Sequence, residues 1–372
     1  MINETRLIDL FTKLCLIDAP SLRERDSVEF VKAYLLENGL EVEEDQAGAA
    51  IGGNANNVIA WLRGSLPDAP KVFLSAHFDT VEPTKGLVIR EIDGVFSSAS
   101  DTILGADDKG GMAPAIEAVL ALKESGLPHG DVCLLLSVAE EIGLLGAAAM
   151  DLERLGLDFG YVLDTSPPVG SFVTRAGTHD SFKAIIRGKP AHAGKEPEKG
   201  INAISVAAEA INGMRLGRIA EETTANIGSI HGGSAANVVC PEVKVIAEAR
   251  STDVAVLDAQ VGHMVQRFEE AAAKFGATVE IDHGRHYVGY TIEPDAPVLR
   301  VAREAAASLG LSGKTRTTLG GSDANVFNAK GLSCVVLATG MDKIHTHDEH
   351  ISRSDLVLTA RLSLAILLGV AK

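Results

Sequence analysis

The sequence predicts an α/β protein whose largely parallel sheet is interrupted by a smaller, inserted ferredoxin-like α+β domain. Three observations lead to this prediction. Apolar runs of strand length recur in the first half of the chain, at residues 57–62, 71–76, 131–139 and 159–164. Segments with a helical spacing of apolar residues separate several of these runs. Beyond residue 176 the order of expected elements changes to β-α-β-β-α-β, which is typical of a split βαβ domain.

The sheet domain is predicted from both ends of the chain. Strands that are apolar throughout are buried on both faces, which indicates a parallel sheet covered by helices. Asn3 is placed to cap a first helix, and Gly39 to end a second one. Helices are expected at residues 3–14, 25–39, 110–123, 144–155, 298–310 and 354–370, and one more buried strand at 333–339. Residues 1–176 and 288–372 are therefore expected to form one domain.

The inserted domain is predicted over residues 177–287. Its expected strands are 181–188, 225–230, 243–251 and 278–287, and its expected helices are 200–216 and 253–276. This order of elements is ferredoxin-like, and the segment is long enough to form a domain of its own.

Composition excludes several classes of partner. The formal net charge is −16, and a phosphate backbone requires a basic surface, so we expect neither nucleic acid nor an anionic membrane as a partner. No apolar run approaches the ~20 residues that span a bilayer, and the N-terminal segment lacks the regions of a signal peptide. The cysteines lie far apart, which favours free thiols in a reducing cytoplasm; they are Cys15, Cys133, Cys240 and Cys334. The expected location is therefore cytoplasmic.

Histidines and acids follow the ends of the predicted strands. In open parallel sheets, ligands bind outside the carboxyl ends of the strands, so side chains that follow several strands gather at one edge. The residues at these positions are His77, Glu140, Glu141, Asp164 and His345. Asp107 joins them from a glycine-rich turn before the helix at 110–123, where glycine allows tight backbone.

Five of these residues form a candidate metal-ligand set, namely His77, Asp107, Glu141, Asp164 and His345. Three carboxylates and one hydroxide would balance two divalent cations, so the set suits a pair of such ions. Imidazole and carboxylate are compatible with zinc, and also with cobalt or manganese. Two ions close together can bind a substrate and activate a shared water. Taken singly, each acid is more often a helix cap or a surface charge; their coincidence favours the metal site.

Asp79 lies two residues after His77. On an extended chain these two side chains lie on the same face, so the Asp79 carboxylate can orient the imidazole and improve it as a metal ligand. The alternative is a turn in which Asp79 caps local backbone groups.

These motifs resemble a family of co-catalytic zinc peptidases that includes peptidase T, carboxypeptidase G and aminoacylase. The matches are His-x-Asp-Thr-Val at 77–81, Gly-Ala-Asp-Asp-Lys-Gly-Gly at 105–111, the pair at 140–141, Asp164, His345 with Glu349, Ala-His-Ala-Gly at 191–194, Gly-Gly-x-Ala-Ala-Asn-Val-Val at 232–239 and Glu-Ala-Arg-Ser at 248–251. The form of the 105–111 motif and the aspartate at 164 look most like the peptidase T branch, which comprises tripeptide aminopeptidases.

The resemblance implies a role for each candidate ligand. Asp107 would bridge two metal ions. His77 and Asp164 would complete the site of one ion. Glu141 and His345 would complete the site of the other.

The resemblance also implies the catalytic residues around the metal ions. Asp79 would orient His77. Glu140 would be the general base, taking a proton from a metal-bridging water and returning it to the leaving nitrogen; such a base is worth roughly 10²–10⁴ in rate. The peptide bond between Asp107 and Asp108 would be cis.

In the inserted domain the resemblance points to three residues. His192 matches a histidine that, in members dimerising through this domain, enters the partner's active site and stabilises the developing oxyanion, so we expect a homodimer formed through the inserted domain. Arg250 would hold a substrate carboxylate, since a guanidinium can bind it bidentately; the alternative is a surface charge at a strand end. Asn237 is a second candidate substrate ligand.

Together these inferences predict a di-metal exopeptidase for short peptides, an aminopeptidase of the peptidase T type. One alternative keeps the same metal site but acts on N-acyl amino acids, or as a carboxypeptidase. A second alternative is a non-catalytic binding protein on the same fold. That alternative would be expected if the ligands or the base were missing, and all of them are present.

Overall fold

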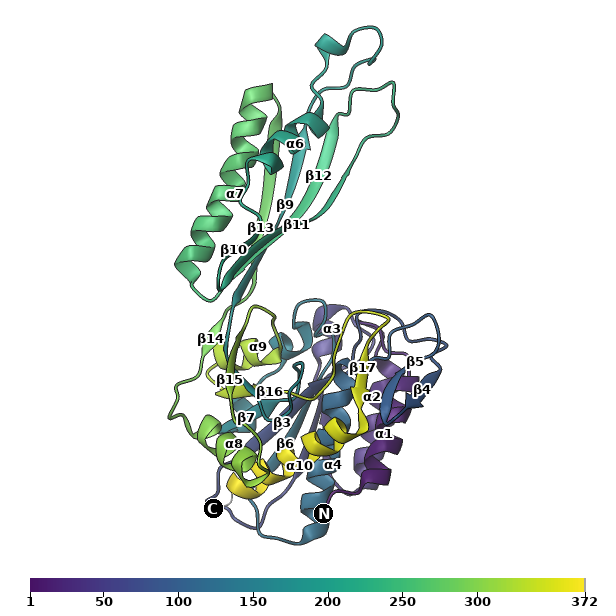
Figure 1. Ribbon diagram of the computed structural model, residues 1–372, viewed down its shortest axis with the longest axis vertical. Helices are drawn as coiled ribbons and strands as arrows, with labels where there is room; N and C mark the ends of the chain where they lie inside the picture. The colour runs from purple at the N-terminus through teal and green to yellow at the C-terminus, as the bar shows by residue number, and fades with distance from the viewer. Residues whose placement is uncertain (371–372) are drawn as a thin grey trace. The chain divides into compact units, whose positions relative to one another are not determined.

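The computed structural model describes residues 1–370, which fall into two compact units (Figure 1). The larger unit comprises Met1–Thr174, Thr291–Thr317 and the residues from Ser322 onward. The smaller unit comprises Arg175–Tyr290 together with Thr318–Gly321. The last of these segments lies well outside the 177–287 range of the expected inserted domain.

The larger unit is an α/β structure built on a nine-stranded mixed sheet. In the order of the sheet, the strands are β1 (Glu41–Glu44), β2 (Val58–Leu62), β6 (Val132–Ser137), β3 (Val72–His77), β7 (Phe159–Val162), β16 (Cys334–Leu337), β8 (Phe172–Ala176) and β14 (Tyr290–Thr291), with β15 (Thr315–Thr318) beside β8. The neighbours β6, β3, β7 and β16 run parallel. The strands β1, β2 and β8 pair antiparallel.

The prediction of an α/β fold is thus confirmed, and the four central strands β6, β3, β7 and β16 form its parallel part. The run at 57–62 is fully buried as β2, yet it pairs antiparallel with β6. Burial on both faces follows from the helices that cover a sheet, so it does not by itself fix the direction of a strand.

Helices cover the sheet of the larger unit. They are α1 (Glu4–Leu16), α2 (Arg25–Glu37), α3 (Ala47–Ile51), α4 (Ala106–Ser125), α5 (Leu145–Ala149), α8 (Pro297–Ser308), α9 (Asp323–Ala329) and α10 (Arg353–Val370). The long helix α4 is buried along most of its length and contacts α1, α10 and strand β3. As predicted, the Asn3 side chain caps α1 by accepting from the Arg6 amide, at 3.1 Å.

Two local predictions were incomplete. The helix expected at 144–155 divides into α5 and a 3-10 turn at Glu153–Leu155, because Met150 adopts extended backbone and is buried. A three-stranded antiparallel sheet of β4 (Ile89–Ile92), β5 (Val95–Ser98) and β17 (His350–Ser352) was not anticipated. Its hairpin turns at Asp93-Gly94, both with positive φ, a dipeptide that favours such turns.

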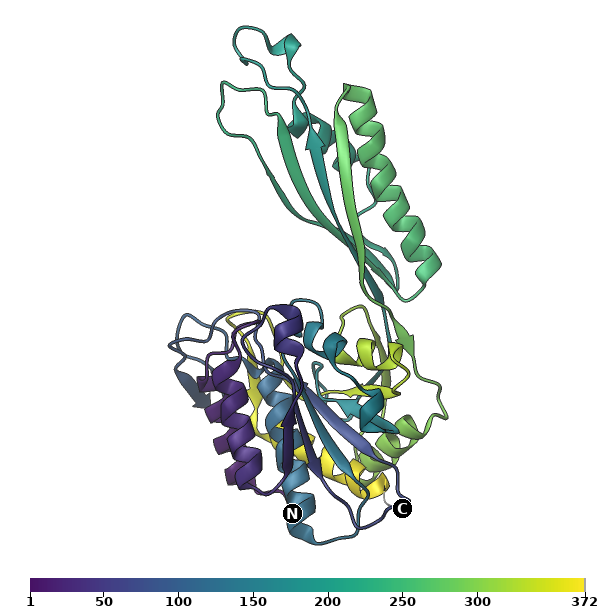
Figure 2. The same ribbon diagram turned by 180° about the vertical axis from the view of Figure 1, so that it is seen from behind.

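The smaller unit has the expected ferredoxin-like order of elements with one addition, a short strand at Gly217–Ala220 that was not predicted. Its sheet runs β10 (Gly217–Ala220), β11 (Thr223–Gly232), β12 (Glu242–Ser251), β9 (Thr178–Arg187) and β13 (Thr278–Tyr287), and every pair is antiparallel. The helices α6 (Ala203–Asn212) and α7 (Val254–Phe275) cover one face of this sheet, and α7 runs along it in Figure 2. Phe182 and Phe268 meet edge to face in the core between them.

Within residues 1–370, no helix combines the length and the hydropathy that a membrane crossing requires.

Candidate metal centre

The strand-end residues of the larger unit meet at one edge of its sheet. His77 is the last residue of β3 and lies opposite Ser137, the last residue of the parallel strand β6. Glu140 and Glu141 follow β6, and Asp164 follows β7, which is also parallel to β3. The parallel arrangement therefore delivers all these side chains at the carboxyl ends of the strands, where ligands bind in such sheets.

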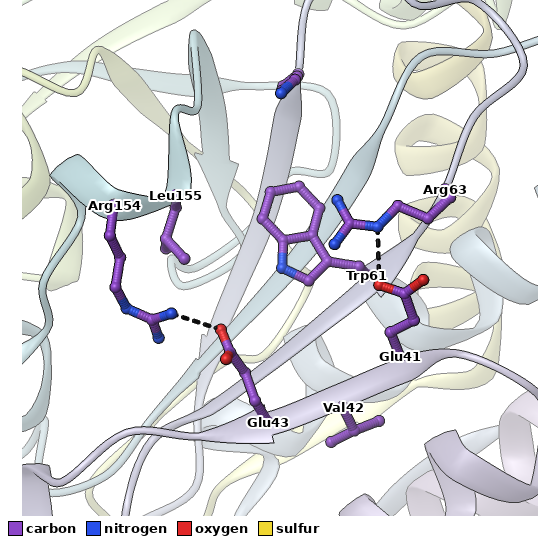
Figure 3. Close-up of a pocket in the computed structure, with 8 residues that line it drawn as sticks. Glu41, Val42, Glu43, Trp61, Arg63, Arg154 and Leu155 are labelled. Carbon is purple, nitrogen blue, oxygen red and sulfur yellow. Dashed lines mark hydrogen bonds and ion pairs between the residues drawn. The ribbon is translucent and has the colours of Figure 1, made fainter.

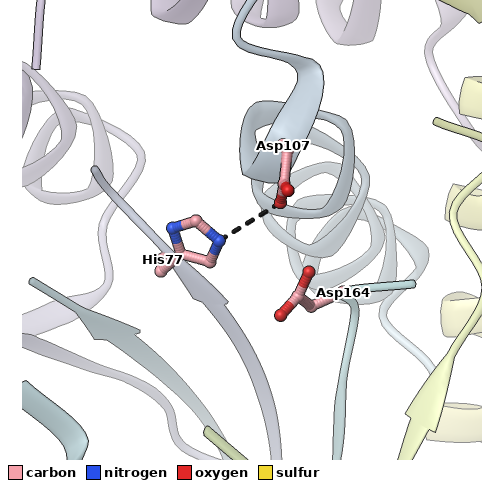
Figure 4. A group of neighbouring side chains, drawn as sticks. All are labelled: His77, Asp107 and Asp164. Carbon is pink, nitrogen blue, oxygen red and sulfur yellow. Dashed lines mark hydrogen bonds and ion pairs between the residues drawn. The ribbon is translucent and has the colours of Figure 1, made fainter. Parts of the chain in front are cut away.

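Asp107 lies at the centre of the cluster, between two imidazoles. Its Oδ1 is 3.3 Å from His77 Nε2, and a dashed line marks this contact in Figure 4. Its Oδ2 is 3.1 Å from His345 Nε2. The same nitrogen of His345 is 3.2 Å from Glu141 Oε2. Asp164 approaches from the His77 side. One carboxylate thus offers an oxygen to each of two groups of potential ligands.

The two groups each contain three side chains whose ligand atoms lie within 4.8 Å of one another. They are His77, Asp107 and Asp164, and Asp107, Glu141 and His345. The residues fit two divalent cations, because the donors are imidazole nitrogens and carboxylate oxygens, which zinc, cobalt and manganese accept. Moreover, Glu141 Oε1 is buried and has no hydrogen-bond partner in the described part of the chain, as an atom reserved for another ligand would.

The electrostatics of the cluster favour added positive charge. Burial and the neighbouring Asp107 raise the pKa of Asp164 well above its usual range. Burial likewise raises the pKa of Glu140. Hydrogen bonds to Asp107 and Glu141 raise the pKa of His345 to about 10. Carboxylates crowded in a buried site are costly unless a cation or a proton compensates them.

Asp79 contacts both His77 and the backbone that follows β6. Its Oδ1 lies 3.4 Å from His77 Nδ1 and accepts from the Glu140 amide at 2.9 Å. Its Oδ2 accepts from the Glu141 amide at 3.2 Å and from Ser21 Oγ at 2.7 Å. Asp79 therefore ties the strand end that carries His77 to the turn that carries Glu140 and Glu141.

Sequence reasoning gave no role to Asp108 or Lys109. The peptide bond between Asp107 and Asp108 is cis. Asp108 Oδ2 accepts from the His77 amide at 3.3 Å, and the buried Lys109 Nζ donates to the Phe78 carbonyl. These contacts hold the 105–111 turn against the end of β3. Both residues belong to the 105–111 motif, so the sequence marked them as notable. It did not indicate which residues they contact.

Glu349 holds the Asp107 turn from the C-terminal side. It is fully buried, and its carboxylate accepts from the Gly105 amide at 2.7 Å and from the Asp107 amide at 2.9 Å. Burial raises its pKa to about 7. His347 does not enter either ligand group; its Nδ1 lies 3.2 Å from the exposed Asp101.

Gly111 allows α4 to approach the backbone before Asp164. A Cβ at this position would lie 2.0 Å from the Leu163 carbonyl oxygen and 2.3 Å from Asp108 Oδ1. At the neighbouring Gly110, a Cβ would meet only the flexible end of Ile351, at 2.8 Å. The two glycines therefore differ in how much backbone a side chain would displace.

We predict that Gly111→Ala lowers the free energy of unfolding by about 1–3 kcal/mol, the usual cost of overpacking. Gly110→Ala is the matched control and should cost less, because a side chain can move where a backbone cannot. Thermal denaturation of both variants tests this. The account of Gly111 is wrong if the two variants are equally stable.

The other predicted residues belong to the smaller unit. His192 is exposed, and its Nδ1 accepts from the Gly194 amide at 3.2 Å. Asn237 is also exposed, and its carbonyl accepts from the Ala193 amide at 2.9 Å, so these two segments lie side by side. Arg250 is partly buried and bonds to Glu248 Oε2 at 3.0 Å.

A separate hollow of about 430 Å³ lies elsewhere in the larger unit (Figure 3). It is lined by Glu41, Val42, Glu43, Trp61, Arg63, Lys71, Arg154 and Leu155. It is at the amino-terminal ends of the parallel strands, because Lys71 directly precedes β3. Arg63 is already paired with Glu41 at 2.8 Å. Arg154 is paired with Glu43 at 2.9 Å. We assign this hollow no function.

Comparison with known proteins agrees with this geometry. Over its full 372 residues the chain is 41% identical to the whole of the uncharacterized protein YqjE of Bacillus subtilis (strain 168). Among solved structures, it resembles one described as aminopeptidase PepT from Bacillus cereus ATCC 10987, with a TM-score of 0.90, 41% identity and full coverage of both chains.

A second solved structure is described as a tripeptidase from Staphylococcus aureus subsp. aureus mu50. The TM-score is 0.94 and the identity 40%, over 100% of this chain and 99% of that one. Residues 73–369 match the model of peptidase family M20/M25/M40. The chain therefore belongs to peptidase family M20/M25/M40 and is a metallopeptidase.

Proposed function

We propose that this peptidase is an aminopeptidase that removes the N-terminal residue of short peptides, tripeptides among them, with two divalent cations. The observation that carries the proposal is the position of Asp107, whose two oxygens each face a different imidazole at 3.3 and 3.1 Å. It is supported by the likeness to two structures described as an aminopeptidase and a tripeptidase, each over the whole chain.

Five side chains would hold the two ions, with Asp107 shared between them; they are His77, Asp107, Glu141, Asp164 and His345. Zinc is the ion that we propose, because imidazole and carboxylate suit it well. When bound, such a pair of ions polarises the scissile carbonyl and makes water more acidic.

Glu140 is the general base in this proposal. Its side chain is almost fully buried, and its Oε2 lies 4.0 Å from His77 Nε2, so the carboxylate borders the ligand cluster without belonging to either ligand group. From there Glu140 takes the proton of the attacking water and passes it to the nitrogen of the leaving amine. The same carboxyl group thus acts first as a base and then as an acid, so a single residue is sufficient for both proton transfers.

His192 is proposed as the oxyanion donor, supplied by the partner of a homodimer. The Gly194 amide donates to His192 Nδ1 at 3.2 Å, so the neutral ring carries its proton on Nε2. Because the ring is exposed, this N–H is available to a developing oxyanion. Arg250 and Asn237 are proposed as substrate ligands; for Arg250 a substrate carboxylate would have to compete with Glu248.

The smaller unit offers a surface for such a homodimer. Strand β10 pairs with β11 only near Thr223–Ala225, so within residues 1–370 the outer edge of 226–232 has no strand partner. The large apolar residues Ile204, Ile230 and Val238 are exposed in the same unit. An unpaired strand edge with apolar neighbours readily accepts a second strand, and a second copy of this chain is the partner that we propose.

The substrate assignment can be tested with one panel of peptides. The zinc-loaded protein is incubated with free, N-acetylated and C-amidated di- and tripeptides, and the products are identified by mass. We expect cleavage of the free peptides, slower cleavage of the amidated ones, which lack the carboxylate proposed for Arg250, and no cleavage of the acetylated ones. Cleavage of the acetylated set would contradict an aminopeptidase. Release of acetate would then favour an N-acyl amino acid hydrolase, whereas release of the C-terminal residue from free and acetylated but not amidated peptides would indicate a carboxypeptidase.

The role of His192 can be tested by complementation. His192→Ala should lower kcat by about 10²–10³, the usual cost of a lost oxyanion donor, and Glu140→Gln should also be nearly inactive. When the two variants are mixed, dissociated and reassociated, half of the dimers are mixed and each of these has one intact site. Activity should therefore return to about a quarter of wild type, because every other site lacks either the oxyanion donor or the base.

Subunit exchange must be demonstrated independently, for example with a mass-tagged copy. If exchange occurs and activity does not return, His192 does not act across a dimer. Lys195→Ala, a change of an exposed residue in the same loop, serves as the control for damage to that loop.

A further inference from the structure

The turn that carries Glu140 is held by side chains from three other segments. Four successive backbone amides donate to them. Val138 donates to Asn57 Oδ1 at 3.0 Å, Ala139 to Glu24 Oε1 at 3.0 Å, Glu140 to Asp79 Oδ1 at 2.9 Å and Glu141 to Asp79 Oδ2 at 3.2 Å. Because no helix or sheet satisfies these amides, the direction of the turn depends on its side-chain acceptors.

The backbone conformation of Ala139 makes the turn depend even more on these acceptors. It directly precedes Glu140 and has a φ of 52°, in the left-handed region that residues with a Cβ rarely adopt. Such a conformation persists only where the surroundings hold it in place. The group that meets the Ala139 amide is Glu24, a residue from the N-terminal part of the chain.

Glu24 Oε1 accepts hydrogen bonds from the amides of two residues that have left-handed backbone. Besides the Ala139 amide it accepts from the Leu22 amide at 2.9 Å, and Leu22 has a φ of 67°. The side chain is only 1% exposed, so it is not a surface charge. It does not cap helix α2 either, although Glu24 is the residue that precedes it. Its role in the structure is thus to join the two turns.

The segment around Glu24 is attached to the candidate metal centre at further points. Ser21 Oγ donates to Asp79 Oδ2 at 2.7 Å, and the Thr80 amide donates to the Ala19 carbonyl at 3.1 Å. Asp18 Oδ1 accepts from the Thr84 amide at 2.6 Å. Residues 18–24 lie outside the 73–369 range that matches the family, yet they contact both strand ends that carry the candidate catalytic residues.

We propose that Glu24 is a positioning residue for the general base: by accepting from the Ala139 amide, it fixes the backbone direction from which Glu140 reaches the substrate water. This inference rests on the proposed role of Glu140. Glu24 itself does not touch the substrate, and it acts through the backbone of its neighbour. What matters is an acceptor oxygen at this point rather than a negative charge.

The proposal predicts a loss that is confined to kcat. Glu24→Ala leaves the buried Ala139 amide and the part-buried Leu22 amide without this acceptor. The turn then relaxes and the base is misplaced; a displacement of about 1 Å can cost about 10²-fold in rate. We expect kcat to fall by about 10- to 100-fold with KM changed by less than about threefold, since the Glu141 amide on the same turn keeps its own acceptor, Asp79 Oδ2. Glu24→Gln keeps a carbonyl oxygen at the same place and should retain more than about a third of wild-type kcat.

The contact itself can be observed without any activity measurement. In hydrogen–deuterium exchange of the full chain, peptides that contain residues 138–141 should exchange faster in Glu24→Ala than in Glu24→Gln or wild type. Ser27→Ala is the matched control. Ser27 lies three residues after Glu24, in the first turn of α2, and is also buried; its hydroxyl has no hydrogen-bond partner within residues 1–370.

Three results would overturn the inference. They are a kcat of Glu24→Ala within threefold of wild type, a Gln variant as impaired as the Ala variant, or an equal loss in Ser27→Ala.

Failure of the proposed function would give a different set of results. If Glu140→Gln stays active while Glu24→Ala still speeds exchange at 138–141, the base assignment is wrong and the contact is real. If Glu140→Gln is inactive while Glu24→Ala keeps its activity, the assignment of Glu140 as the base is supported and Glu24 does not position it.

Discussion

Replacement of Glu140 by glutamine is expected to lower kcat by at least about a hundredfold, the lower end of what a positioned general base contributes. The amide keeps the shape of the side chain but cannot take a proton from water. Because Glu140 belongs to neither ligand group, both metal ions should stay bound. Steady-state kinetics and metal analysis on the same preparation measure the two effects.

Glu153→Gln, which changes an exposed glutamate of the same unit, is the control and should leave kcat unaltered. A Glu140→Gln variant that keeps more than a tenth of wild-type kcat would show that another group removes the proton. Loss of metal in Glu140→Gln would instead mean that Glu140 is a ligand.

The second large effect is expected at Asp107. Asp107→Ala should lose both metal ions, and with them the activity, because one carboxylate serves both ligand groups. Metal content per chain, measured after dialysis, gives the result. Chelation should inactivate the wild type in the same way, and Zn²⁺ or Co²⁺ should restore its activity but not that of Asp107→Ala.

The control for Asp107 is Asp101→Ala, a change of a fully exposed acid in the same part of the chain, which should keep two ions. Retention of one ion by Asp107→Ala would contradict the bridging role. The metal would then be shared in another way among the residues of the cluster.

The sequence predicted those site residues that lie at the ends of buried strands. His77, Glu141 and Asp164 each come directly or shortly after an apolar run, and parallel pairing then delivers them to one edge. The elements of the smaller unit other than β10 were predictable from their own residues. Apolar residues recur with a period of two in its strands and of 3.6 in its helices, and turn residues bound each element.

The contacts that hold the site were not predictable in this way. Glu24, Ser21 and Asn57 are polar residues of loops and helix ends, and nothing in their local sequence separates them from surface residues. They act through hydrogen bonds to residues far along the chain, such as the one from Ala139 to Glu24. The direction of β2 was missed for a related reason, because it depends on which strand lies beside it rather than on its own residues.

The central claim is that two divalent cations share Asp107. The most direct test is anomalous diffraction from crystals of the zinc-loaded protein, recorded at the zinc edge. We predict two peaks in each chain, one between His77, Asp107 and Asp164, and the other between Asp107, Glu141 and His345. A single peak at full zinc occupancy, or two peaks of which one lies away from Asp107, would contradict the claim.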